Sequence, residues 1–546
     1  MHDKTTLLLS LVAFTGVAFV LMRFWLPSAL ETILNFVETK KFWVSLCGLF
    51  LATYLLALIA NTTYPGYLEH IEPNIASVSF VLMKGAPLYH DLDSTQRYSF
   101  PYGPMAYLPY TLALRLMGAN VLSLKIIVLL ANLLLVMLLW RCYRQLLDPA
   151  HALLVIAAIF AYLLVYDYVF QVRGDILVIF SVALGLYAIL VAPARLAMLL
   201  LALACGFAFD IKVTALFYFL PLYSLLLRRC GWRLAMLAAI GAAMFALTPF
   251  LLPGISAAGY LDWLRVTSRE PLVKSEALRE LKLLPFVFAP LGLFLWRMAR
   301  RSRGLLATYL DQNRTFLIVL SGCLAVVAVT SLKIGAGPHH FLPFYPIIGY
   351  VCADVYNNTE NANVVPYASP VSFIPLFWTW VAIAVLMQLG SAFPQTVSTL
   401  LGSRSHASAV ASDLETVMKS YSGKKIEMGY GGWNSKHQLT YFRPALVFAG
   451  NPFTIDALAL GDMQLSGLTI PRSTLEYLQG CKTQIWLIPR DEPPFSMPNV
   501  YSLMAPHLFP LRPLFSDEFR RIFFQQYRKQ GSSQYFDIWE CPMVRD

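Results

Sequence analysis

The acidic side chains best suited to chemistry lie in a polar interlude, residues 61–118, between two hydrophobic segments. It contains Glu69, Glu72, Asp91 and Asp93. Carboxylates are costly beside a bilayer, so a cluster of them at one membrane face indicates a functional site. In the alternative interpretation, these acidic residues belong to an exterior loop and interact only with solvent. In the functional interpretation, one of these carboxylates takes a proton from an incoming hydroxyl group.

Basic side chains stand where other hydrophobic segments end. They are Arg173, Lys212 and Lys333, which lie beside Asp175, Asp210 and the pair His339 and His340. Cations that converge at one membrane face, opposite a loop rich in carboxylates, suit an anionic ligand presented by the bilayer. Arg and Lys donate charge-assisted hydrogen bonds to phosphoryl oxygens, so phosphate on a lipid carrier is the favoured ligand. Contact with lipid headgroups is the alternative for such cations.

A carboxylate and cations together suit group transfer from that phosphate. If a sugar is attached to it, transfer requires a base for the acceptor hydroxyl and positive charge for the departing phosphate. Direct displacement at the anomeric carbon needs only one catalytic base, unlike the two carboxylates of retaining hydrolysis.

The composition excludes a soluble globular protein. Of the 546 residues, 58% are hydrophobic and only 13% are charged, which indicates a helical membrane protein with many spans. The net charge of +11 comes from short basic clusters between apolar runs. Such clusters hold loops in the cytoplasm, so we exclude nucleic-acid binding.

Apolar runs near the roughly 17–25 residues that cross a bilayer recur along the chain. They predict about twelve spans, near 7–26, 42–60, 121–140, 151–169, 175–192, 196–210, 213–227, 234–252, 283–297, 315–331, 341–356 and 371–393. Residues 7–26 are interpreted as an uncleaved span, because no small-residue cleavage pattern follows them.

Basic clusters orient these spans. Clusters recur after every second crossing and mark the cytoplasmic loops, at residues 40–41, 141–144, 195, 228–233 and 297–303. The alternate loops then face the exterior, namely 61–120, 166–174, 253–282, 332–340 and everything after about 394. This alternation requires residues 102–118 to lie in the membrane interface rather than cross it.

Three stretches of sequence also resemble a known family. The run EHIEPNIASVSFVLMKGAPLYHDLDSTQRYSFPYGP resembles the first extracytoplasmic loop of GT-C superfamily glycosyltransferases, with an acidic residue, a helix, G-x-x-L-Y and P-Y-x-P. VRGDILVIFSVALGLY resembles the V-R-x-D-x-L segment of that group. KIGAGPHHFLPFYP resembles its late K-x-G element. The likeness covers most of residues 42–390 in layout.

The resemblance implies a GT-C fold and an inverting transfer from a polyprenyl-phosphate sugar to an acceptor on the exterior face. Lipid A aminoarabinose transferases and protein O-mannosyltransferases work in this way. The family base is usually an Asp, often followed by Glu, and this sequence departs from that pattern. We expect Glu72 to be the base, with Glu69 as the alternative, because Pro73 favours a helix that starts just after Glu72.

The resemblance also distributes further roles. Residues expected near the donor phosphate are Lys333, Arg173, Lys212, His339 and His340. Residues expected to bind substrate are Asp91, Tyr89, Arg97, Tyr102 and Asp175.

The composition changes after the last predicted span. Residues 1–393 form the predicted transmembrane domain, and residues 394–546 form a predicted extracytoplasmic α/β domain. Its expected strands lie in KKIEMGYGG, ALVFAG, QIWLIP and YFDIWEC, and its expected helices at 473–478 and 517–529. If this part is exported, Cys481 and Cys541 can form a disulfide. We expect the domain to cap the site and guide the acceptor.

The predicted fold class is thus a mainly α, polytopic membrane protein with a C-terminal α/β domain. Two other functions stay open. A flippase or transporter of lipid-linked saccharides would favour internal repeats and charges at mid-span. An O-antigen ligase or polymerase would place its principal exterior loop late. We expect a bacterial inner-membrane protein with its site on the periplasmic side. The expected partners are a polyprenyl-phosphate sugar, a glycan, lipid or protein acceptor, and membrane lipids. No cofactor is predicted, and a divalent metal is left open.

Overall fold

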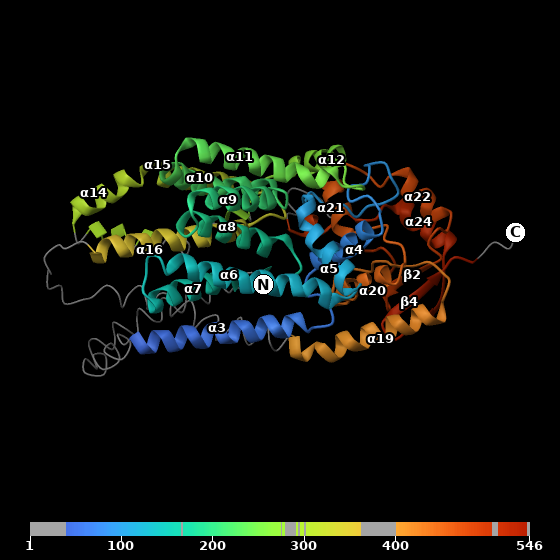
Figure 1. Cartoon of the computed structure of the whole chain (residues 1–546). Coiled ribbons are helices and arrows are strands. Elements are labelled where there is room, and N and C mark those ends of the chain that lie inside the picture. The colour runs from blue at the N-terminus through green and yellow to red at the C-terminus, as the bar shows by residue number, and fades with distance from the viewer. Residues whose placement is uncertain are drawn as a thin grey trace.

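A bundle of long helices forms most of the molecule. The computed structural model describes residues 40–164, 168–274, 276–278, 291–292, 295–296, 298–299, 302–361, 400–504 and 512–542. The helices of the bundle lie side by side along its length (Figure 1), and they are α3 (Lys40–Thr62), α6 (Val121–Tyr143), α7 (Pro149–Leu163), α8 (Gly174–Leu190), α9 (Ala194–Phe209), α10 (Leu216–Cys230), α11 (Trp232–Leu247), α14 (Arg303–Gln312), α15 (Arg314–Thr330) and α16 (Tyr345–Asn361).

Four of these helical segments are long and apolar enough to cross a membrane, at Val44–Thr62, Val121–Tyr143, Val213–Cys230 and Trp232–Leu251. Helices α14 and α15 make a fifth if they count as one span bent by 75°. A mainly helical membrane fold is therefore supported, but the predicted number of about twelve spans is not confirmed within the described residues. Helices α7, α8 and α9 match predicted spans in position but, with 15, 17 and 16 residues, are shorter than the four segments above. The predicted spans 7–26 and 371–393, and most of 283–297, lie outside the described residues.

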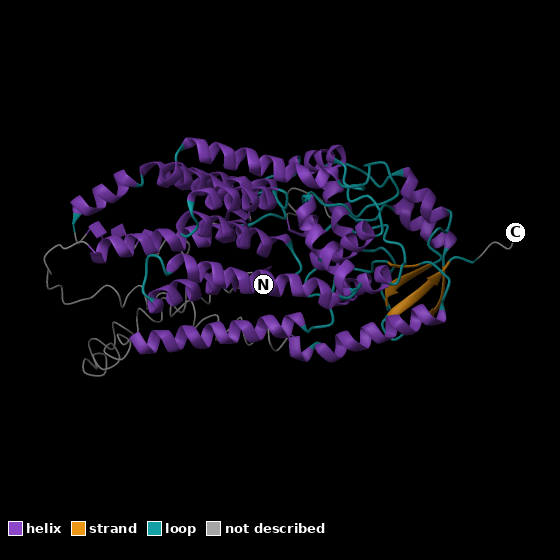
Figure 2. Ribbon diagram, in the orientation of Figure 1, coloured by secondary structure: helices purple, strands orange, loops and turns teal. Residues whose placement is uncertain are grey.

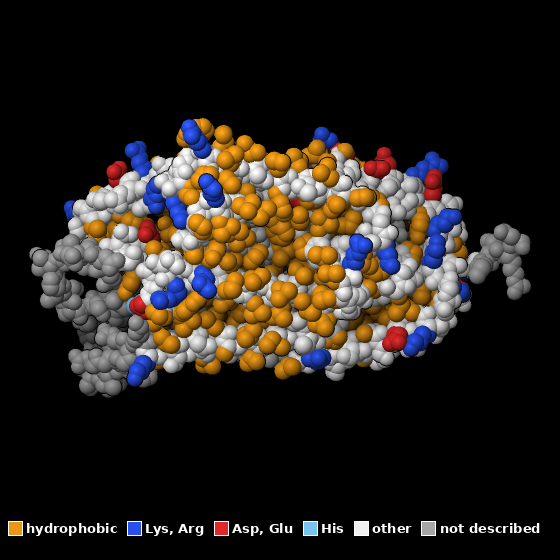
Figure 3. Space-filling view, viewed as in Figure 1, with side chains coloured by type: hydrophobic (Ala, Val, Ile, Leu, Met, Phe, Trp, Pro, Cys, Tyr) orange, Lys and Arg blue, Asp and Glu red, His pale blue; other side chains and the backbone are white. Residues whose placement is uncertain are grey.

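The outer surface of the bundle has the character of a membrane protein. Figure 3 shows an apolar band across the middle of the visible face, with Lys and Arg gathered toward both ends. Large apolar side chains are exposed on the helices of the bundle, including Leu130 and Met137 of α6 and Met244 of α11. Inside, small residues bring helices together: a Cβ on Gly206 of α9 would lie 2.6 Å from the carbonyl oxygen of Ala242 of α11.

The polar interlude folds at one end of the bundle. It contains α4 (Ile71–Met83), the 3₁₀ turn η1 (Pro104–Ala106) and α5 (Leu108–Met117), and α12 (Ala257–Ser268) lies at the same end (Figure 1). Helix α5 has only 10 residues, too few to cross a bilayer. It therefore agrees with the prediction that residues 102–118 do not span.

The chain from residue 400 onward covers this same end of the bundle. All the strands that the structure describes are here (Figure 2), in the order β1 (Ile426–Met428), β2 (Ile485–Pro489), β4 (Phe536–Glu540) and β3 (Arg528–Ser532). Strand β1 pairs parallel with β2, and the other two pairings are antiparallel. The helical elements are α19 (Arg404–Ser420), η8 (Ser435–Phe442), α20 (Arg443–Phe448), α21 (Ala457–Leu465), α22 (Arg472–Gln479), α23 (Val500–Met504) and α24 (Asp517–Gln526).

Most of the predicted elements of this region are confirmed, and one is wrong. ALVFAG is not a strand but lies largely in α20, where Pro444 occupies the first turn and starts the helix. Strand β3 was not predicted, because its sequence RKQGS has no alternation of apolar residues. The predicted disulfide between Cys481 and Cys541 is formed.

Main-chain hydrogen bonds join the polar interlude to this region. The N–H of Arg97 donates to the carbonyl of Thr454 at 2.7 Å, and the N–H of Asp456 donates to the carbonyl of Arg97 at 2.7 Å. Together they form an isolated parallel bridge between Arg97 and Ile455. The hydroxyl of Ser473 also donates to the carbonyl of Asp93 at 2.6 Å.

Candidate active site

Glu72 holds the beginning of the polar interlude against the turn that precedes α8. Its Oε2 accepts from the N–H of Leu68 at 2.7 Å and of Glu69 at 3.2 Å, and its Oε1 accepts from the N–H of Val172 at 2.8 Å. Glu72 is 1% exposed. Backbone donors therefore occupy both carboxylate oxygens, and burial raises the pKa of the side chain against the opposing effect of Lys125.

Lys125 binds the first residues of the polar interlude, where α3 ends. This residue of α6 is 1% exposed, and its ammonium group donates to the carbonyls of Asn61 at 2.9 Å and Tyr64 at 3.0 Å. It thereby ends α3 and fixes the path of the chain toward Glu69. Because Lys125 is also the positive charge that faces Glu72, the two side chains compensate each other's burial.

Glu69 is the more accessible carboxylate. Its side chain is 18% exposed, with Oε2 3.3 Å from Nη1 of Arg173 and Oε1 2.6 Å from Nδ1 of His70. The N–H of Ile71 also donates to Oε2 at 2.9 Å. Burial alone would raise the pKa of Glu69, but His70 and Arg173 outweigh it and lower the pKa to about 2. The carboxylate is therefore ionised throughout the neutral range.

Arg173, Asp175 and Lys212 continue from Glu69 as a chain of ion pairs. Nε of Arg173 lies 2.9 Å from Oδ2 of Asp175, and Nζ of Lys212 lies 2.6 Å from Oδ1 of the same carboxylate. The guanidinium of Arg173 stacks 4.0 Å from the ring centre of Tyr168. We call Glu69, Arg173, Asp175 and Lys212 the ion cluster. It holds two positive and two negative groups and so has no net charge.

Two glycines allow the segments that carry the ion cluster to approach one another. A Cβ on Gly103 would lie 1.9 Å from the carbonyl oxygen of Asp210, and a Cβ on Gly174 would lie 2.5 Å from Cγ2 of Ile211. Only glycine fits at such distances. The first contact brings Tyr102 to 5.7 Å from Nζ of Lys212, and the second sets the start of α8 against the residue that precedes Lys212.

The two histidines lie at the edge of the ion cluster. They belong to the 3₁₀ turn η6 (Pro338–Phe344), and the ring of His339 meets the face of Tyr168 edge-on at 5.1 Å. The ring centres of His339 and His340 are 4.6 Å apart. Burial, followed by the nearby positive charge of Lys212, lowers the pKa of His340 to about 3 and that of His339 well below its usual value. Both rings are neutral in the site as it stands.

Several residues predicted at the site have other partners. The guanidinium of Arg97 is fully buried and donates to the carbonyls of Gln96 and Leu92, which secures its own loop. The hydroxyl of Tyr89 donates to the carbonyl of Tyr102 at 2.7 Å and so positions that residue. Asp91 is exposed in the loop that follows. These contacts favour supporting roles over direct contact with a substrate.

Lys333 belongs to a second polar group beside α12. Its ammonium group donates to the carbonyls of Thr267 at 3.2 Å and Ser268 at 3.3 Å. Burial raises the pKa of Glu270 to about 9 and that of Asp462 to about 7; the charge of Asp462 adds to the rise at Glu270, and Lys333 opposes it. The C-terminal region therefore contributes an acid next to a residue that the sequence places at the donor site.

The site also contains three residues that the sequence analysis does not predict, namely His70, Tyr168 and Lys125. Lys125 carries a recognisable signal, because it is a charge inside a run long enough to cross a membrane. The adjacent glutamates could have indicated His70, whereas Tyr168 is placed by a turn that has no signature. Within the described ranges, no group of three or more His, Cys, Asp or Glu side chains could hold a metal ion.

The whole architecture is shared with a protein of known structure, although no protein-family model and no curated protein matches the chain. The crystal structure of ArnT from Cupriavidus metallidurans bound to undecaprenyl phosphate superposes with a TM-score of 0.55 at 14% identity, over 93% of this chain and 99% of ArnT. The apo ArnT structure gives 0.54 at 14% identity, over 90% and 97%. The chain therefore has the fold of ArnT, which confirms, for the fold, the GT-C resemblance predicted from the sequence.

Proposed function

We propose that this protein is a glycosyltransferase that moves a sugar from a polyprenyl-phosphate carrier to an acceptor. One observation carries the proposal: an ionised, partly exposed carboxylate, Glu69, lies 3.3 Å from the guanidinium of Arg173, and Arg173 begins a chain of buried ion pairs. An acceptor hydroxyl and a sugar phosphate need such opposite charges side by side. The ArnT structure that shares this fold holds undecaprenyl phosphate.

The reaction that fits this arrangement is a single displacement. The acceptor oxygen attacks the anomeric carbon, its proton passes to Glu69, and a new carbon–oxygen bond forms with inversion. The bond from the anomeric carbon to the phosphate oxygen breaks, and its electron pair stays on the polyprenyl phosphate. Arg173 and Lys212 stabilise that charge with hydrogen bonds.

Glu69 fits the part of the base better than Glu72. The carboxylate of Glu72 already accepts three backbone N–H groups and is 1% exposed, so an acceptor hydroxyl would have to displace main-chain hydrogen bonds to reach it. We assign Glu72 a positioning part, in which it holds the chain that carries Glu69.

The histidines complete the charge balance. The ion cluster has no net charge, so a bound phosphate brings an uncompensated negative charge into a buried site. His339 and His340 are neutral there because of burial and nearby cations. A phosphate beside them favours their protonated forms, so they can take up the charge that appears on the leaving group.

The acceptor would be glycosylated on the side of the membrane where the polar interlude lies. The basic clusters assign this side to the exterior, which in a bacterium is the periplasmic face of the inner membrane. Glycan, lipid and protein acceptors all remain in this proposal.

Transfer by the purified protein tests the proposal. The protein, in lipid, receives a panel of undecaprenyl-phosphate sugars and acceptors, and release of undecaprenyl phosphate is measured with the glycosylated product. We expect release with one donor and its loss in Lys212→Met. The matched control is Lys419→Met, a change in an exposed lysine of α19. Donor that crosses the bilayer intact would instead indicate a flippase, and failure of every donor to bind would refute the proposal.

A further inference from the structure

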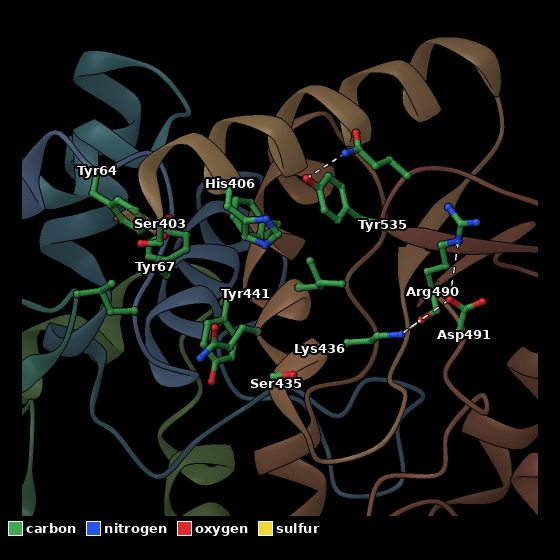
Figure 4. A pocket seen from close by; sticks show the side chains of 15 residues that line it. Tyr64, Tyr67, Ser403, His406, Ser435, Lys436, Tyr441, Arg490, Asp491 and Tyr535 are labelled. Atoms are coloured by element: carbon green, nitrogen blue, oxygen red, sulfur yellow. Dashed lines mark hydrogen bonds and ion pairs between the residues drawn. The ribbon is translucent and has the colours of Figure 1, made fainter. Parts of the chain in front are cut away.

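A cavity of about 550 Å³ opens between the polar interlude and the C-terminal region. One wall is the chain that leads to Glu69, and the others come from α19, η8, the turn after β2 and the turn between β3 and β4 (Figure 4). We call it the lateral pocket. Of its 15 lining residues, only Tyr64, Tyr67 and Leu68 precede residue 400. None belongs to the donor-phosphate group described above.

The walls of the lateral pocket are rich in tyrosine. Tyr64, Tyr67, Tyr441 and Tyr535 line it together with the polar side chains of Ser403, Ser435, Gln438 and Gln534. A tyrosine ring offers a flat apolar face and a hydroxyl at its edge, which suits a sugar ring with its apolar face and hydroxyl rim. The hydroxyl of Tyr67 is buried and has no hydrogen-bond partner among the described residues.

Among the residues that line the lateral pocket, the ionised side chains are Lys436, Arg490 and Asp491, which form its rim, while Asp413 lies behind the wall and accepts from the N–H of Tyr535. Lys436 and Arg490 face a single acid, Asp491, at 3.9 Å each, so the carboxylate compensates only one of them. The ammonium of Lys436 donates to the carbonyl of Arg490 at 2.8 Å, which uses one of its three protons. His406 lies nearby, edge-on to Tyr535 at 5.1 Å. This rim suits an anionic group rather than a neutral one.

The sheet holds the cationic rim in place. The N–H of Arg490 donates to the carbonyl of Tyr535 at 2.8 Å, and the N–H of Asp491 donates to Oδ2 of Asp537 at 3.2 Å. Asp491 has a φ of 62°, a left-handed conformation that Asp adopts more readily than most residues. A turn fixed in this way presents its side chains with little loss of backbone freedom on binding.

The lateral pocket adjoins the proposed base. Its wall residue Leu68 directly precedes Glu69, and the N–H of Leu68 is one of the donors to Glu72. Tyr441, another wall residue, lies near enough to Glu69 that burial and then the charge of that carboxylate raise the pKa of the tyrosine. A ligand in the pocket therefore lies beside the segment that carries Glu69.

We propose that the lateral pocket binds an anionic carbohydrate, the saccharide part of the acceptor. This inference rests on the proposed function, because it places an acceptor hydroxyl at Glu69 while the donor phosphate meets Arg173 and Lys212. The tyrosines hold the sugar rings, and Lys436 and Arg490 bind a carboxylate or phosphate on them.

Saccharide binding to the full-length protein, without donor, tests the lateral pocket. The probes are trigalacturonic acid, which carries carboxylates, mannose 6-phosphate, which carries a phosphate, and neutral maltotriose, and affinities come from saturation-transfer NMR titration. We expect one or both anionic probes to bind more tightly than maltotriose. The double variant Lys436→Ala with Arg490→Ala should weaken that binding about tenfold or more, because charge-assisted hydrogen bonds are lost.

The matched control is Arg472→Ala, which removes an exposed arginine of the same region that pairs only with Glu476 among the described residues. It should leave the affinity unchanged. A second variant, Tyr535→Leu, should weaken binding of every saccharide that binds. Equal binding of maltotriose and the anionic probes, an unchanged affinity in the double variant, or no binding of any probe would overturn the inference.

These outcomes are separable from those of the transfer experiment. If anionic saccharides bind but no polyprenyl-phosphate sugar is consumed, the lateral pocket stands and the proposed function fails. If transfer occurs and the double variant leaves the KM for the acceptor unchanged, the proposed function stands and the lateral pocket fails.

Discussion

Replacing Glu69 and Glu72 separately by Gln distinguishes the proposed base from the proposed positioning residue. Gln keeps the length of the side chain but removes its charge and one acceptor oxygen. Glu69→Gln retains an oxygen for the N–H of Ile71, and Arg173 keeps its 2.9 Å contact with Asp175. Because Arg173 is 5% exposed but keeps Asp175 as a partner, and the Glu69 side chain is 18% exposed, we expect a loss of about 1–2 kcal/mol of stability.

The effect of Glu69→Gln on the reaction should be much larger than its effect on stability. A general base contributes about 10²- to 10⁴-fold to a rate, and an amide cannot accept the proton. We therefore expect kcat to fall by about that factor, with the affinity for the donor retained.

Glu72→Gln should have the opposite profile. An amide nitrogen in place of either oxygen faces at least one buried backbone N–H, of Val172 or of Leu68 and Glu69. A buried donor without a partner costs about 1–3 kcal/mol, and Lys125 loses its opposing charge as well. We expect a loss of roughly 2–4 kcal/mol of stability and a smaller decrease in kcat in the molecules that remain folded.

The assay pairs initial rates of undecaprenyl phosphate release with thermal unfolding of each variant. The reasoning fails if Glu72→Gln unfolds at the wild-type temperature while its kcat is lost and Glu69→Gln keeps full activity. That result would identify Glu72 as the general base, as the sequence predicts.

Three further predictions concern charge and covalent structure. The affinity of the wild-type protein for undecaprenyl phosphate is compared with that of a variant that has Gln at both His339 and His340. The ratio of the two affinities should rise as the pH falls from about 8 to about 5, because the phosphate favours the protonated rings. A ratio that does not change with pH would contradict this. Asp462→Asn should raise the unfolding temperature more at about pH 8 than at about pH 5. Burial raises the pKa of Asp462, so the cost of ionising this buried acid grows as the pH rises toward its raised pKa. A stabilisation by Asn that does not depend on pH would contradict this prediction. The disulfide joins Cys481 and Cys541, which are separated by 60 positions. Replacing both cysteines by Ser should destabilise the C-terminal region by up to about 4 kcal/mol, because the unfolded chain gains entropy without the disulfide. An unchanged midpoint of urea unfolding would show that the disulfide does not stabilise the region.

The sequence predicts the layout of the bundle because hydropathy is a local property. Apolar runs and basic clusters place α3, α6, α10 and α11 within a few residues of their observed bounds. Arg173, Asp175 and Lys212 were likewise expected at one site, since each stands beside an end of an apolar run. Patterns of this kind depend on neighbours along the chain and need no knowledge of the fold.

The choice between Glu69 and Glu72 depends instead on contacts between distant segments. Glu72 is occupied because the N–H of Val172, 100 positions away, donates to it, and a sequence pattern cannot reveal that bond. The same holds for Lys333, which has the expected motif around it but donates to the carbonyls of the last two residues of α12. Arg97 looked like a ligand for anions, and the backbone of its own loop takes its protons.

The bridge between Arg97 and Ile455 constrains how the molecule can be made. The loop that carries Glu69 is synthesised early, but its edge pairs with residues 454–456, which leave the ribosome more than three hundred positions later. During that interval Arg97 lacks its main-chain partners, so the nascent protein cannot complete the site. Assembly of the candidate site is thereby delayed until residues 454–456 have been made, and a chain that ends before them lacks this bridge.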